Sequence, residues 1–164
     1  MRELSTTVEL RIAATPHDIW AYRLDFSNLP RYNPSVREIE QLEIGHPDGT
    51  GARYRFDLDM GAGSHPIDLE VTRVEPDHLV AIDMGGPLPA REEFTVSRAS
   101  PPEDDGPGTP VSCVVAIALT LLVPDTFPTS ADPGLVAGGR DQMQGELEQM
   151  AVILETGSAG PSSA

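Results

Sequence analysis

The stretch AATPHDIWAYRLDFSNLPRYNPSV, residues 13–36, combines a helix start, a short helix and a turn bounded by prolines. Thr15 before Pro16 predicts a helix N-terminus, because a threonine side chain caps free backbone amides and proline is favoured at the first helical position. The side chains that recur at helical spacing after this start are Ile19, Tyr22 and Phe26. Ser27 is a candidate second cap, and the two prolines that follow predict a short second helix and a turn.

Strands surround this stretch. Residues 6–14 alternate apolar and polar side chains, which predicts a half-buried strand. Between turns rich in glycine, proline and aspartate, further strands are predicted at residues 36–44, 52–60, 65–75, 78–84, 90–98 and 111–123. The spacing then becomes helical, which predicts a long C-terminal helix. Its apolar stripe consists of Met143, Leu147, Met150 and Leu154.

This order of elements predicts an α+β fold. Strands joined by short turns form an antiparallel sheet, and only the last helix is large enough to cover its apolar face. We expect a single domain over residues 1–156, with two short helices after the first strand and a curved antiparallel sheet of about seven strands wrapped around the C-terminal helix. Residues 101–110 are expected to form a solvated loop, and residues 157–164 a flexible tail.

Three segments carry a resemblance to a known superfamily. Residues 12–36 contain a small residue and a proline, a helix with an aromatic, an aspartate, Leu-Pro, and an aromatic before another proline. Those positions are Ala14, Pro16, Trp20, Asp25, Leu29, Pro30, Tyr32 and Pro34. The hairpin VREIEQLEIGHPDGTGARYRF and the helix end ELEQMAVILE complete the pattern. Over residues 6–155 the chain resembles the helix-grip (SRPBCC, START-like) superfamily of polyketide cyclases and dehydrases, START lipid-binding domains and the birch-pollen-allergen group.

The resemblance implies a helix-grip fold with a cavity between the concave face of the sheet and the long helix. Apolar walls of this kind suit a hydrophobic or polycyclic ligand. By strand alternation and helix spacing, the candidate ligand-binding side chains are Trp20, Tyr22, Phe26, Phe56, Leu58, Met60, Phe94, Leu119, Met143, Leu147 and Met150. The alternative for any one of them is that it simply fills the core.

Three residues are candidates for catalysis: Glu92, Tyr54 and Tyr32. Glu92 lies two residues before Phe94, so both face the same side of their strand. A carboxyl group in an apolar cavity has a raised pKa and can transfer protons at neutral pH. The alternative is a side chain that reaches solvent at the cavity mouth, and a one-residue bulge would turn it to the other face.

Composition excludes several classes of partner and chemistry. A net charge of -15 repels nucleic acid and anionic membrane surfaces. All basic residues are arginine, which excludes a Schiff-base lysine, and the apolar run 114–123 is too short to span a bilayer. One cysteine, Cys113, and a start without an apolar leader are typical of a cytoplasmic protein. The histidines lack metal-ligand spacing, so we expect no metal and no cofactor.

Three functions remain open at this stage. The first is an enzyme that acts as a cyclase or dehydratase on a polyketide-like intermediate, largely by positioning it. The second is a non-catalytic carrier of a hydrophobic molecule, and the third is a protein-interaction module of the same fold. A buried polar cluster inside the cavity would favour the enzyme over the carrier, whereas a filled core would favour the third reading. A homodimer is compatible with each of them.

Overall fold

The predicted order of strands and helices is confirmed in the computed structural model, which describes residues 1–99 and 111–156. In chain order the elements are β1 (Arg2–Ile12), α1 (Pro16–Leu24), the 3-10 turn η1 (Phe26–Asn28), α2 (Leu29–Tyr32), β2 (Val36–Glu43), β3 (Arg53–Asp59), β4 (Ser64–Glu75), β5 (Leu79–Met84), β6 (Ala90–Arg98), β7 (Cys113–Val123), the 3-10 turn η3 (Thr129–Ala131) and α3 (Asp132–Glu155). The loop expected at 101–110 and the tail expected at 157–164 lie outside the described residues.

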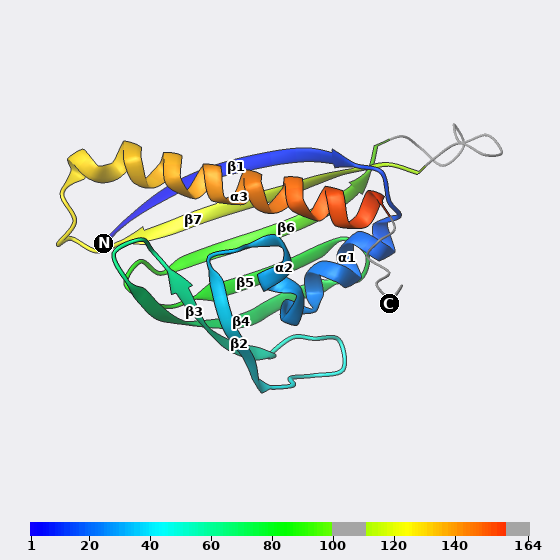
Figure 1. The fold of residues 1–164 in the computed structure, drawn as a ribbon, viewed down its shortest axis with the longest axis horizontal. Helices are drawn as coiled ribbons and strands as arrows, with labels where there is room; N and C mark the ends of the chain where they lie inside the picture. Colours follow the sequence, from blue (N-terminus) through cyan, green and yellow to red (C-terminus); the bar gives the residue numbers. More distant parts are fainter. Residues whose placement is uncertain (100–110, 157–164) are drawn as a thin grey trace.

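The seven strands form one antiparallel sheet in the order β1-β7-β6-β5-β4-β3-β2. Hairpins connect neighbours from β2 to β7, whereas β1 crosses to the far edge and pairs with β7 over its whole length, from Arg2 opposite Val123 to Ile12 opposite Cys113. Figure 1 shows α3 running along the β1 and β7 side of the curved sheet, with the start of α1 near the C-terminal end of α3 and α2 below its middle. This is the predicted helix-grip arrangement.

The opening stretch folds almost as its residues predict. The Thr15 side chain accepts a hydrogen bond from the Asp18 amide at 3.1 Å, and Pro16 occupies the first turn of α1. The residue that caps the turn after α1 differs from the one expected from the sequence. Asp25, not Ser27, caps the next turn, because its carboxylate accepts from both the amide and the hydroxyl of Ser27. The reason is that a 3-10 turn begins at Phe26, whereas a cap at Ser27 would start the helix at Asn28.

A buried arginine joins the short helices to the sheet and to α3. Arg23 of α1 is only 1% exposed. Its guanidinium donates to Glu92 Oε1 on β6 and, at 3.1 Å, to Glu146 Oε1 on α3. Asn33, just after α2, donates to Glu146 Oε2 at 2.7 Å. Because each partner comes from a different element, this network fixes how α1, α2 and α3 sit on the sheet.

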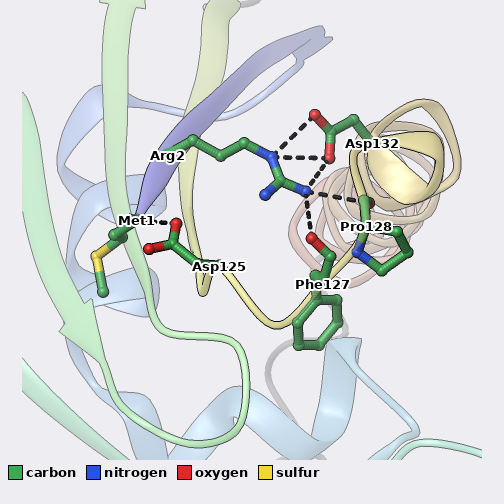
Figure 2. A network of polar contacts seen from close by, with 6 residues as sticks. All are labelled: Met1, Arg2, Asp125, Phe127, Pro128 and Asp132. Atoms are coloured by element: carbon green, nitrogen blue, oxygen red, sulfur yellow. Dashed lines mark hydrogen bonds and ion pairs between the residues drawn. The ribbon is translucent and has the colours of Figure 1, made fainter.

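A second set of polar contacts fastens the start of α3 to β1, as Figure 2 shows. Arg2 donates from Nη2 to Asp132 Oδ1 at 2.6 Å and from Nε to both oxygens of that carboxylate at 3.1 Å. The same Nη2 donates to the backbone carbonyls of Phe127 and Pro128, both at 3.1 Å. The segment between β7 and α3 is therefore tied to the first strand.

We predict that Arg23→Met destabilises the protein by about 3–5 kcal/mol, because it leaves two carboxylates buried without their cation. Urea unfolding followed by circular dichroism measures the change in unfolding free energy. The matched control is Arg55→Met, which removes an exposed, solvent-screened pair with Asp68 at 2.7 Å and should change the unfolding free energy far less than Arg23→Met does. Equal losses in the two variants would contradict a structural role for the buried network.

Candidate functional site

A cavity of about 280 Å³ lies between the concave face of the sheet and α3. Strands β3 to β7 provide one wall, α3 provides the other, and residues from α1 through α2 close one end. Most of the lining is aliphatic or aromatic, as Phe56, Leu69, Ile82, Leu121 and Met143 illustrate. The sequence pattern that makes a half-buried strand therefore also makes the apolar wall of the cavity.

The two ends of the cavity differ in chemistry. At one end the lining includes Arg23, Asn33, Glu92 and Glu146, all of them buried. At the other end it includes exposed residues of α3 and of the β3 terminus, such as Gly138 and Met60, which is 48% exposed. Solvent therefore reaches the cavity near the start of α3, and the charged groups lie at the closed end.

Glycines on α3 set the space at the open end. A Cβ atom built on Gly134 or Gly138 meets no atom within 4 Å, so both positions leave room in the lining. At Gly139 a Cβ would lie 2.9 Å from Leu119 Cδ2, so here the missing side chain lets α3 approach β7. Glycine in a helix interior costs roughly 0.5–1 kcal/mol relative to alanine. Only Gly139 recovers part of this cost through close packing.

The structure places Glu92 in the cavity wall, 7% exposed, while Arg91 and Glu93 on either side of it face solvent. Glu92 is thus held by Arg23 inside the protein and is not solvated at the mouth, which was the alternative.

The other two catalytic candidates lie outside the lining of this cavity. Tyr32 is buried with its ring 5.1 Å from the Arg23 guanidinium, and its hydroxyl has no hydrogen-bond partner among the described residues. Tyr54 is buried against Phe26, with 5.7 Å between the ring centroids. Its side chain lines a second, more open pocket between α1 and the β2–β3 hairpin, together with Trp20.

The expected ligand-binding residues divide into two groups. Those that line the cavity are Phe26, Phe56, Leu58, Met60, Leu119 and Met143. Those that do not line it are Trp20, Tyr22, Phe94, Leu147 and Met150. In the second group, the Trp20 indole N–H donates to the Leu79 carbonyl at 3.2 Å, Tyr22 packs against Tyr32, and the other three are fully buried in the core.

Sequence reasoning missed three polar residues of the site: Arg23, Asn33 and Glu146. A signal was present for two of them. Arg23 lies four residues after Ile19 on the buried face of α1, and Glu146 lies three residues after Met143 on the buried face of α3. A charged residue at an apolar-face position needs a buried partner, and that is what the structure supplies. Asn33 carried no such signal, because it lies in a turn, where asparagine is common for conformational reasons alone.

The buried charges at the closed end are unequal in number. Arg23 is the one cation and Glu92 and Glu146 are the two carboxylates in the lining. Burial raises the pKa of the Glu146 carboxyl, and the neighbouring Arg23 opposes this rise only in part. Burial likewise raises the pKa of the Tyr32 phenol, which keeps the phenol protonated. The Glu146 carboxyl therefore binds a proton more readily than an exposed glutamate would.

Within the described residues the structure holds neither a metal site nor a membrane span. Residues 1–99 and 111–156 hold no group of three His, Cys, Asp or Glu side chains that could bind a metal ion. No helix within these ranges is both long and apolar enough to cross a membrane. Cys113 is a buried free thiol whose pKa is raised by burial, and its Sγ lies 3.3 Å from the Ala14 carbonyl oxygen. It behaves as a core residue.

Known structures share this architecture. A START superfamily protein from Mycobacterium smegmatis aligns with a TM-score of 0.72 at 18% identity, over 94% of this chain and 97% of that one. The Zhui aromatase/cyclase from Streptomyces sp. R1128 aligns with a TM-score of 0.72 at 14% identity, over 94% of each chain. Norcoclaurine synthase from Thalictrum flavum, in complex with dopamine and hydroxybenzaldehyde, aligns with a TM-score of 0.66 at 20% identity, over 94% of this chain and 88% of that one.

At these identities the similarity shows the fold alone. No curated protein matches the sequence. A family match is nevertheless present: residues 2–155 match the family described as polyketide cyclase / dehydrase and lipid transport. That range includes every helix and strand of the described structure. The chain belongs to the polyketide cyclase / dehydrase and lipid transport family.

Proposed function

We propose that this protein binds a hydrophobic, aromatic or polycyclic small molecule in the cavity between its sheet and α3. The observation that carries the proposal is the cavity itself, about 280 Å³ with apolar walls and polar side chains gathered at one end. Ligand sites combine these two features, because apolar surface supplies affinity and a few polar groups fix the orientation. The family description, which includes lipid transport, supports the same reading.

Two structural relatives also support an aromatic ligand. One is an aromatase/cyclase, and another was solved with dopamine and hydroxybenzaldehyde. Because their identities to this chain are 14% and 20%, they indicate what the fold accommodates and leave the particular ligand open. The acidic charge of -15 and the single thiol favour a small-molecule partner in a reducing cytoplasm over nucleic acid.

One observation favours catalysis, by a cyclase or dehydratase-like reaction, over carriage alone. Glu92 Oε1 is held by Arg23, whereas Glu92 Oε2 has no hydrogen-bond partner among the described residues and belongs to a side chain in the cavity wall. A carboxylate fixed in this way can accept a proton from an acidic C–H or O–H of a bound molecule. Ring closure and dehydration of a polyketide-like chain both begin with such a transfer. The alternative is a carrier in which Glu92 only orients the ligand.

Binding is tested by filling the open end of the cavity. We predict that Gly138→Leu weakens binding of the neutral probe 2-naphthylmethanol at least tenfold in isothermal titration calorimetry, because the new side chain occupies space in the lining. Gly145→Leu is the matched control: it lies on the same helix, is equally free of neighbours within 4 Å, and is outside the lining. Equal affinity of both variants and the wild type would place the probe elsewhere.

Proton transfer is tested with 5-nitrobenzisoxazole, a neutral bicyclic compound. A base removes its ring C–H proton, the N–O bond breaks, and a coloured nitrophenolate with a nitrile is released. We predict that the protein accelerates this ring opening and that Glu92→Gln lowers the rate by about 10²-fold or more, the usual contribution of a general base. Glu93→Gln, on the solvent side of the same strand, should retain the wild-type rate. A Glu92→Gln variant with full activity would leave only the carrier function.

A further inference from the structure

The charges around the cavity do not balance. Among the described residues that line it, only Arg23, Glu92 and Glu146 are charged. With both glutamates ionised, the closed end carries one negative charge in excess. All three residues are at most 7% exposed, so bulk water screens this charge weakly. An uncompensated buried charge is costly and attracts either a proton or a cation.

The hydrogen bonds show which atom carries the unsatisfied charge. The Ser35 amide donates to Asn33 Oδ1 at 3.1 Å, so Asn33 turns its amide N–H₂ toward Glu146. Glu146 therefore has a donor on each oxygen, one from Asn33 and one from Arg23. Glu92 receives a donor on Oε1 alone, and within residues 1–99 and 111–156 nothing donates to Oε2. The free acceptor of the network is Glu92 Oε2.

The hydrogen bonds and charges at the closed end also disfavour a negatively charged ligand. The two terminal nitrogens of Arg23 and the amide nitrogen of Asn33 already donate to carboxylates. A ligand carboxylate or phosphate at this end would meet excess negative charge, and among the described residues the one Arg23 nitrogen without a partner is the buried Nε. The net charge of -15 over the whole chain opposes such a ligand further.

We propose that the ligand of this cavity is an amphipathic amine, whose ammonium group donates to Glu92 Oε2 while its hydrophobic body lies along the apolar wall. This inference rests on the proposed function, since it specifies the chemistry of a ligand in the same cavity. An ammonium group supplies both the missing hydrogen-bond donor and the missing positive charge. No lysine exists in the chain to supply that charge from the protein.

Three probes that share a naphthalene ring test this inference by calorimetry at pH 7: 2-naphthylmethylamine, 2-naphthylmethanol and 2-naphthoate. They carry a positive, a zero and a negative charge. We expect the amine to bind about tenfold more tightly than the alcohol, since a hydrogen bond between two charged groups is stronger than one from a neutral hydroxyl. The carboxylate should bind more weakly than the alcohol. An alcohol or carboxylate that binds as tightly as the amine overturns the inference.

Two variants assign the preference to one side chain. Glu92→Gln keeps an oxygen for Arg23 and removes the excess charge, so it should bring the affinities for amine and alcohol within about threefold of each other. Glu93→Gln changes the net charge equally but faces solvent, and should leave the wild-type preference intact. A preference that survives Glu92→Gln, or disappears in Glu93→Gln, contradicts the assignment. If Glu92→Gln does not fold, the three-probe comparison on the wild type still decides.

The outcomes separate this inference from the proposed function. If none of the three probes binds, the proposed ligand cavity fails and the inference fails with it. If the alcohol binds and Gly138→Leu weakens it, the cavity stands whatever the charge preference is. An amine no tighter than the alcohol then overturns the amine inference alone.

Discussion

The structure depends on one buried cation. Arg23 has partners on β6 and α3, and the rings of Tyr32 and Phe94 lie 5.1 and 5.0 Å from its guanidinium carbon. Burial opposes its charge, but the nearby Tyr32, Glu92 and Glu146 outweigh that penalty and raise the pKa of the guanidinium. Removing the cation would leave its carboxylates in an apolar interior. The packing of helices on sheet and the polarity of the cavity are therefore consequences of the same contact.

Local patterns predicted the fold well because their causes are local. Thr15 and Pro16 start α1 through contacts within one turn, and alternation assigns each strand a buried face. The polar site depends on residues 23, 33, 92 and 146, which only the folded chain brings together. Alternation also predicts which face of a strand a side chain is on, but it does not predict which pocket along that face the side chain lines. Tyr54 and Phe56 share one face of β3, yet Phe56 lines the main cavity and Tyr54 lines the second pocket.

The apolar wall and the charged end of the cavity have separate physical origins. The apolar wall arises from generic strand and helix patterns, which many sequences satisfy, and structures with 14–20% identity accordingly reproduce the architecture. The charged end arises from a few specific side chains. A neutral residue in place of Glu92 removes the excess negative charge of the closed end and leaves the apolar wall intact. Similarity of fold therefore says little about the ligand.

The pairing of β1 with β7 has a consequence for the order of folding. Arg2 lies opposite Val123 in the sheet and contacts Asp132 at the start of α3, and even the nearest paired residues of β1 and β7, Ile12 and Cys113, lie 101 positions apart in the sequence. Loop closure over such a separation is slow compared with hairpin formation. During synthesis, β2 to β6 can form their hairpins early while their apolar face lacks α3. The cavity between the sheet and α3 is then complete only when the last helix has been made, and until that point the nascent chain exposes the apolar side chains that line it.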